Sequence, residues 1–288
     1  MKNLNYELKQ LCQRNNDGSF ATRADRERLL SLAATQLVEL GFVSMNAHSL
    51  RPKHVEALVD RWKQENLSTG AVKNRMAALR WWAEKVNKQN VVKRTNAEYG
   101  IDKRVFMTNV SKATTLDATQ LASIKDPYTR ASLMLQATFG LRREESIKII
   151  PSWADRGNYL SLKDTWTKGG LARRISIVTP EQRMALDEAK AVANKGSLIP
   201  KGFQYRDQLH RFRSQCASAN ISRVHGLRHR YALERYFALT GWKSPSEGGP
   251  SSHQLTAIQK KRDREVRLII SREMGHQREQ ITAIYCGR

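Results

Sequence analysis

The segment MGHQREQITAIY, residues 274–285, and the earlier segment HGLRH, residues 225–229, decide how this chain is interpreted. The first ends in a tyrosine, and the second holds an arginine between two histidines. A phenol that loses its proton can attack phosphorus, histidine carries protons, and a guanidinium binds phosphate oxygens. These residue types therefore indicate chemistry at a phosphate group.

Two further segments lie upstream of this pair. In GLRREE, residues 140–145, Glu145 follows Arg142 by three residues, a spacing that lets the two side chains pair on a helix. Lys168 begins the turn sequence Lys-Gly-Gly between two β-rich runs, 159–166 and 173–178, which predicts a hairpin with the lysine in its turn. Each motif alone is weak evidence, but the ordered set is specific.

The four segments, in this order, resemble the active-site motifs of the tyrosine recombinase/integrase family, and together they cover the second half of the chain. The resemblance implies the catalytic residues Arg142, Lys168, His225, Arg228, His276 and Tyr285. It also implies that Glu145 supports this set by orienting Arg142 rather than by transferring a proton.

Phosphoryl-transfer chemistry explains why these residue types would gather. Arg142 and Arg228 would bind the non-bridging phosphate oxygens, and His276 would donate a hydrogen bond to the same group. A phenol has an ordinary pKa of about 10, so a nucleophilic tyrosine needs a base, for which His225 is the candidate. By resemblance, Lys168 would protonate the departing 5′ oxygen.

The resemblance therefore implies a site-specific DNA recombinase or integrase that cleaves and rejoins DNA through a 3′-phosphotyrosine intermediate, for integration or excision of a mobile element. Such an intermediate conserves the phosphodiester energy, so we expect independence from ATP. Because the arginines would neutralise the phosphate, we also expect no requirement for a metal ion or another cofactor. The sequence also lacks a Gly-x-x-x-x-Gly-Lys-[Ser/Thr] phosphate loop. A type IB topoisomerase-like or resolvase enzyme is an alternative, and a catalytically inactive DNA-binding regulator is another.

The composition favours a polyanionic partner. The 288 residues include 50 Lys and Arg against 27 Asp and Glu, a formal charge of +23. An excess of this size favours nucleic acid, and the resemblance implies double-stranded DNA with paired recombination sites. No segment approaches the roughly 20 apolar residues of a membrane span, and the first twenty residues lack a signal-peptide core. We therefore expect a cytoplasmic, nucleoid-associated bacterial or phage protein.

Metal and disulfide sites are not expected. Cys12, Cys216 and Cys286 are odd in number and far apart, which favours free thiols. His225 and His229 are four residues apart and could share a helical face as zinc ligands. However, the His-Glu-x-x-His motif is absent and no third ligand is evident.

The predicted fold is mainly α with a small antiparallel β-sheet, in the two-domain architecture of tyrosine recombinases. The expected parts are a helical core-binding domain over residues 1–95, a linker over 96–112, and a mixed α/β catalytic domain over 113–288 with an insertion around 241–262. The first domain rests on apolar residues at three- and four-residue steps, which predict helices over 30–40, 52–62 and 68–86.

Two pairs of basic residues are candidate DNA contacts. Lys73 and Arg80 are seven residues apart and share a helical face away from the apolar stripe. Lys260 and Lys261 lie at the end of the predicted insertion, which we expect to contact DNA or a neighbouring protomer. The alternative for each pair is a solvated surface charge, and the large basic excess favours phosphate contact.

The expected assembly is a monomer in free solution and a homo-tetramer on DNA, with accessory DNA-bending or directionality factors as further partners. Many relatives continue beyond the tyrosine into a helix that docks on the next subunit. Here three residues follow Tyr285, so the sequence does not indicate how the protomers would contact one another.

Overall fold

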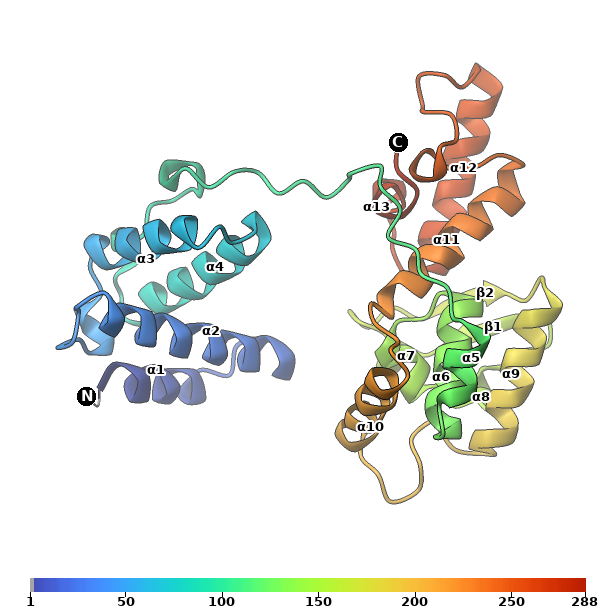
Figure 1. Cartoon of the computed structure of the whole chain (residues 1–288), viewed down its shortest axis with the longest axis horizontal. Helices are drawn as coiled ribbons and strands as arrows, with labels where there is room; N and C mark the ends of the chain where they lie inside the picture. Colours follow the sequence, from blue (N-terminus) through green and yellow to red (C-terminus); the bar gives the residue numbers. More distant parts are fainter. Residues whose placement is uncertain (1–2) are drawn as a thin grey trace. The chain divides into compact units, whose positions relative to one another are not determined.

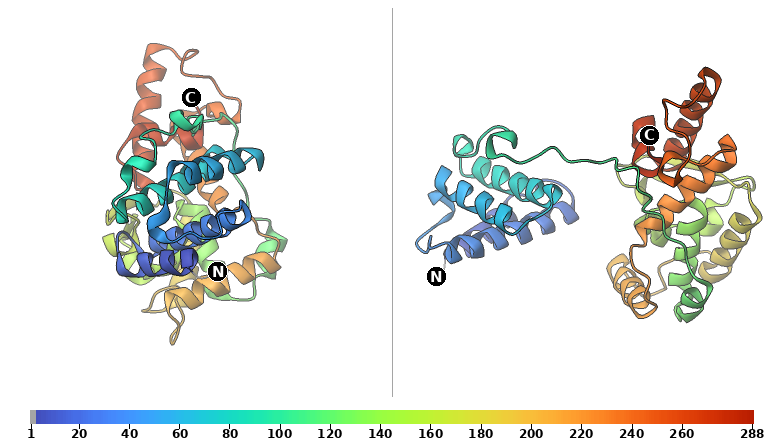
Figure 2. Two further views of the ribbon diagram at one scale, coloured as in Figure 1. Left: turned by 90° about the vertical axis from the view of Figure 1, so that its left-hand side faces the viewer. Right: turned by 45° about the horizontal axis from the view of Figure 1, so that its top comes forward.

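The computed structural model describes residues 3–288, which form two compact units that meet in sequence between Val105 and Phe106. The first unit, here unit 1, contains α1 (Asn3–Arg14), α2 (Phe20–Glu39), η1 (Ala47–Ser49), α3 (Pro52–Gln64), α4 (Thr69–Lys85), η2 (Gln89–Val91) and η3 (Ala97–Tyr99). Figures 1 and 2 show α1 and α2 lying side by side in this unit.

Local sequence signals set the helix starts of unit 1. The Ser19 and Ser68 hydroxyls accept hydrogen bonds from backbone N–H groups in the first turns of α2 and α4, and Pro52 opens α3. Helix α2 begins at Phe20, ten residues before the apolar stripe that predicted it. The stripe did not extend to the first turns because they are largely exposed; Phe20 is 86% exposed. The three predicted helices are present.

The core of unit 1 includes large buried side chains whose polar atoms are satisfied. Trp62 donates its indole N–H to the Gln36 side chain, and Trp82 donates to the Ala47 carbonyl, both at 2.8 Å. Tyr99 and Ile101 are also buried in this core, so the first residues of the predicted 96–112 linker pack against unit 1.

Unit 2 contains α5 (Ala118–Ser123), α6 (Pro127–Phe139), α7 (Arg143–Lys148), α8 (Pro151–Ala154), β1 (Tyr159–Leu162), η4 (Asp164–Trp166), β2 (Arg173–Ser176), α9 (Pro180–Ala193), α10 (Tyr205–Ser218), α11 (His225–Thr240), η5 (Pro245–Glu247), α12 (Ala257–Glu273), η6 (Glu279–Ile281) and α13 (Ala283–Cys286). Its largest core cluster joins apolar residues of α6, α9, α11 and α12 and includes Tyr285. The fold class predicted from the sequence is confirmed.

The hairpin of unit 2 has the predicted antiparallel form. Tyr159 pairs with Ser176 and Leu162 pairs with Arg173. Along β2, Arg173 and Ile175 face the interior while Arg174 is exposed, as the period of two in a strand requires. A charged residue therefore occupies an inward position.

The predicted insertion at 241–262 has two parts. Up to Ser252 it is loop and turn with the short helix η5, whereas residues 257–262 form the first turns of α12, capped by the Thr256 hydroxyl. In the described part of the chain, no helix has the length and apolar character needed to cross a bilayer.

Candidate active site

Tyr285 lies at the meeting point of segments that are far apart in the sequence. It sits in the four-residue helix α13 and is 7% exposed. The ring centroid of His229 lies 4.6 Å from that of Tyr285, and those of His225 and His276 lie 6.4 Å away. The phenol oxygen accepts a hydrogen bond from Nε of Arg228 at 3.4 Å.

Arg228 connects three of the motifs. It projects from the first turn of α11, is 1% exposed, and donates from its two terminal nitrogens to the carbonyls of Gly140 and Met274. Together with the bond from Nε to Tyr285, three of its five N–H donors therefore bind groups of the protein itself, which the sequence did not predict. Burial lowers the pKa of Arg228, and the adjacent Tyr285 opposes this.

Glu145 holds two arginines at once. It lies in α7, is completely buried, and accepts hydrogen bonds from the Arg142 backbone N–H at 2.8 Å and from Arg142 Nη1 at 2.7 Å. Arg173 of β2 binds both of its oxygens, at 2.9 and 2.6 Å. Burial would raise the pKa of Glu145, but Arg173 and then Arg142 lower it to about 2. The carboxylate is therefore ionised throughout the neutral range.

Arg173 is a residue that the sequence reasoning missed. Its Nε also donates to the main-chain carbonyl of Glu273, at 2.8 Å, just before the Met-Gly-His turn. The available signal was the alternation of β2, which places this arginine on the same face as Ile175. An inward arginine in a strand is rarely buried without a carboxylate partner.

The histidines of the cluster are neutral at neutral pH. Burial lowers the pKa of His276 to about 4, with Arg142 adding to the effect, and its Nε2 lies 3.4 Å from Nη2 of Arg142. Burial also lowers the pKa of His225, and lowers that of His229 to about 4. Nδ1 of His229 is buried and has no hydrogen-bond partner among residues 3–288.

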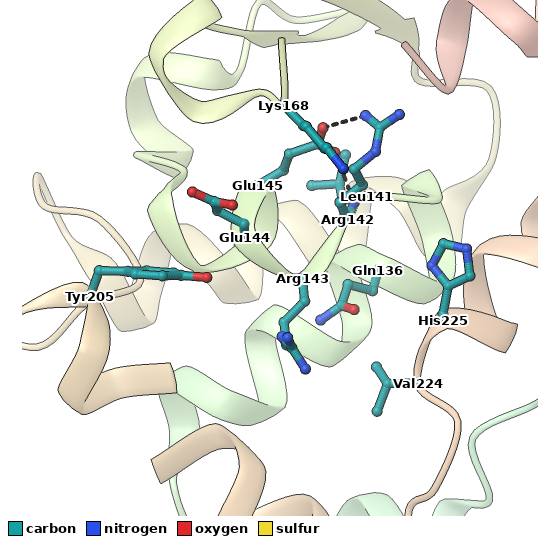
Figure 3. Close-up of a pocket in the computed structure, with 10 residues that line it drawn as sticks. All are labelled: Gln136, Leu141, Arg142, Arg143, Glu144, Glu145, Lys168, Tyr205, Val224 and His225. Carbon is teal, nitrogen blue, oxygen red and sulfur yellow. Dashed lines mark hydrogen bonds and ion pairs between the residues drawn. The ribbon is translucent and has the colours of Figure 1, made fainter. Parts of the chain in front are cut away.

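Lys168 lies beside the cluster rather than within it. Figure 3 shows its side chain extending toward Arg142 across a cavity of about 400 Å³ that His225 also lines. Gly169 and Gly170, which follow it, have φ of +88° and +67°, and neither has a neighbouring atom where a Cβ would stand. The turn that carries the lysine therefore has space around it.

Several contacts hold the tyrosine helix within unit 2. Ser246 of the 244–249 loop donates to the Tyr285 carbonyl at 3.2 Å, and Arg267 donates to the Gly287 carbonyl at 2.8 Å. Asn109 exchanges two hydrogen bonds with the backbone of Arg288. The predicted insertion thus contacts the segment that carries Tyr285.

Of the four candidate DNA contacts, two lie at the start of α12 in unit 2 and two lie in unit 1. Lys260 and Lys261 are exposed in the first turns of α12, about 20 Å along the helix from its end at Glu273. In unit 1, Lys73 is half-buried and Arg80 donates to the Lys93 carbonyl. All three cysteines are buried free thiols, and the described residues contain no group of three potential metal ligands.

Two family models match the chain. The one described as phage integrase, N-terminal, matches residues 1–92, and the one described as integrase matches residues 103–234. The second range ends before His276 and Tyr285, so the placement of these two residues rests on the geometry of this chain. A comparison with curated proteins gave no match.

Solved structures share the fold over nearly the whole chain. The integrase of the Tn1549 transposon, in complex with circular intermediate DNA, has a TM-score of 0.55 and 13% identity, covering 100% of this chain and 96% of that one. XerH recombinase bound to difH gives 0.57 and 13%, covering 98% and 80%. A lambda integrase tetramer bound to a Holliday junction gives 0.56 and 12%, covering 97% and 76%.

Proposed function

The chain belongs to the tyrosine recombinase (phage integrase) family, and from this premise we propose that it cleaves and rejoins DNA through a 3′-phosphotyrosine formed on Tyr285. One observation carries the proposal. Three separated segments bring Arg142, Arg228 and His276 to the neighbourhood of Tyr285, with a guanidinium nitrogen 3.4 Å from the phenol oxygen.

The environment of Tyr285 suits a nucleophile. Arg228 donates a hydrogen bond to the phenol oxygen at 3.4 Å and so helps to orient it. His225 is neutral because burial lowers its pKa, so it has a lone pair with which to accept a proton, directly or through water. In the proposed step the phenol oxygen bonds to phosphorus, its proton passes to His225, and the bond to the 5′ oxygen breaks.

The departing oxygen and the phosphate need positive groups. Lys168 would donate a proton to the 5′ oxygen, and its position in a turn with open surroundings lets it follow the DNA. The free N–H groups of Arg142 and Arg228, with a hydrogen bond from His276, would stabilise the charge on the non-bridging oxygens. Glu145 would orient Arg142.

Rejoining is the reverse reaction with a new partner. A 5′ hydroxyl from a second DNA end attacks phosphorus, the bond to Tyr285 breaks, and the phenol recovers its proton. Because the energy of the phosphodiester is kept in the intermediate, the proposed reaction requires no ATP, and the arginines would neutralise the phosphate in place of a metal ion. The proposed substrate is double-stranded DNA with paired sites. Protomers that are monomers when free would bind it as a tetramer. Accessory factors would set the direction of the reaction, which integrates or excises a mobile element.

The test uses nicked duplexes drawn from the DNA that flanks the gene. When such a suicide substrate is cleaved, the short 5′ product diffuses away and the covalent adduct accumulates on a denaturing gel. We expect an adduct in EDTA and without nucleotide, and none with Tyr285→Phe. Tight binding without adduct would instead support a regulator, and relaxation of any supercoiled plasmid would support a topoisomerase.

A further inference from the structure

Arg173 touches both sides of the cluster without touching Tyr285. Its terminal nitrogens bind the two oxygens of Glu145, and its Nε binds the Glu273 carbonyl at 2.8 Å. Glu145 carries Arg142, while Glu273 is three residues before His276. One side chain from the strand after the lysine turn therefore ties together two other motifs.

The space around Gly275 shows how tightly these parts fit. This glycine precedes His276 and has φ of +71°, and a Cβ on it would stand 3.0 Å from Nη1 of Arg173 and 3.1 Å from Nη1 of Arg142. The two guanidinium groups thus lie together against the turn that carries the histidine. A displacement of Arg173 would move both the turn and Arg142.

The charges explain why a second arginine is needed. Glu145 is fully buried, and a buried carboxylate attracts every donor within reach. Arg142 now gives it one backbone N–H and one side-chain nitrogen, Nη1, while Nη2 lies near His276. If Glu145 lost its two hydrogen bonds from Arg173, it would accept further hydrogen bonds from the Arg142 side chain.

We propose that Arg173 is a positioning residue for the phosphate site. It binds both oxygens of Glu145 and fixes the turn before His276, so that Arg142 keeps the Nη2 edge of its guanidinium for the scissile phosphate. This inference rests on the proposed function, since it concerns how the same site recognises the charge of the phosphate.

The experiment compares Arg173→Gln and Arg173→Lys with Arg174→Gln. Arg174 is the matched control because it follows Arg173 on the same strand but is exposed, with its guanidinium 5.1 Å from the Tyr159 ring. Single-turnover cleavage is measured on suicide duplexes that carry either a phosphate or a neutral methylphosphonate at the mapped scissile position. Circular dichroism at each condition reports folding.

On the phosphate duplex, we expect Arg173→Gln to slow cleavage roughly 100-fold, as misplacement of a binding group by about 1 Å does. Arg173→Lys keeps the charge but not the fork, so it should remain folded and be slowed roughly tenfold. On the methylphosphonate duplex, which lacks the oxygen charge that Arg142 would bind, both defects should shrink several-fold. Arg174→Gln should cleave both duplexes at the wild-type rate.

Equal slowing of an Arg173 variant on the two duplexes would indicate a purely structural role and overturn the inference, and so would unslowed cleavage by both variants. If Arg173→Gln does not fold, the Arg173→Lys comparison decides. Failure of the wild-type protein to form an adduct would instead count against the proposed function itself.

Discussion

Replacing Gly140 with alanine tests the close packing behind the arginine motif. Gly140 ends α6 with φ of +59°, and a Cβ there would stand 2.4 Å from Cδ1 and 2.9 Å from Cγ of Tyr231. The ring is buried, and its hydroxyl donates to Glu273 at 2.9 Å, so it has little freedom to move. The carbonyl of Gly140 also accepts from Arg228.

Two costs add in this variant. An L-residue in the left-handed region costs about 1–2 kcal/mol, and forcing a methyl group into a packed core costs about 1–3 kcal/mol more. The free energy of unfolding of unit 2 should therefore fall by about 2–5 kcal/mol. Gly241 provides the control, since it ends α11 with φ of +85° and has no atom within 4 Å of its Cβ position. Its alanine variant should lose only the first amount.

Pulse proteolysis in urea measures these losses, and mass spectrometry of the fragments assigns them to unit 2. Equal losses for Gly140→Ala and Gly241→Ala would refute the argument, because the two sites share the left-handed conformation and differ in the Tyr231 ring. Adduct formation by Gly140→Ala should also slow, since the carbonyl that holds Arg228 shifts with the helix end.

Three further predictions follow from charge and burial. Burial, with nearby positive charge, lowers the pKa of His229 and His276 from 6.5 to about 4. Between these pH values the unfolded chain binds more protons than the folded chain, so the free energy of unfolding should fall as pH is lowered from 6.5 to 4. Urea titrations that show no such fall would contradict this. Lys260→Gln and Lys261→Gln should each reduce the slope of log binding constant against log salt by about 1, measured by fluorescence anisotropy, and an unchanged slope would remove these lysines from the DNA interface. Glu145→Gln should lower the free energy of unfolding by about 3–5 kcal/mol because it leaves a buried guanidinium without its carboxylate, and a loss below about 1 kcal/mol in denaturant titration would show that the ion pair is not needed.

The sequence predicted the parts whose signals are local. Apolar stripes predicted α2, α3 and α4 of unit 1, though not α1, and two β-rich runs around a glycine turn predicted the hairpin, because both patterns depend only on near neighbours. The motifs around Arg142, Arg228 and Tyr285 were recognisable by their order. Their meeting in space depends on the packing of α6, α11 and α12, which no short pattern encodes.

Other features were hidden because they depend on contacts distant in sequence. Arg173 looked like one of many basic residues, and only the path of β2 past Glu145 makes it a partner. His229 was considered as a zinc ligand, but its ring lies closest to Tyr285 among the three histidines around it. The insertion at 241–262 was predicted to contact DNA or another protomer, which stays a prediction; its contact with the tyrosine segment through Ser246 was not foreseen.

The burial of Arg228 links folding to ligand binding. Within residues 3–288 no carboxylate forms an ion pair with it. The positive charge of this buried side chain is therefore stabilised by two main-chain carbonyls and a phenol oxygen rather than by water. Around it, the guanidinium groups of Arg142 and Arg173 share one carboxylate, that of Glu145. The fold therefore gathers like charges at one place, and we expect an anion bound there to raise the melting temperature as its concentration exceeds the dissociation constant.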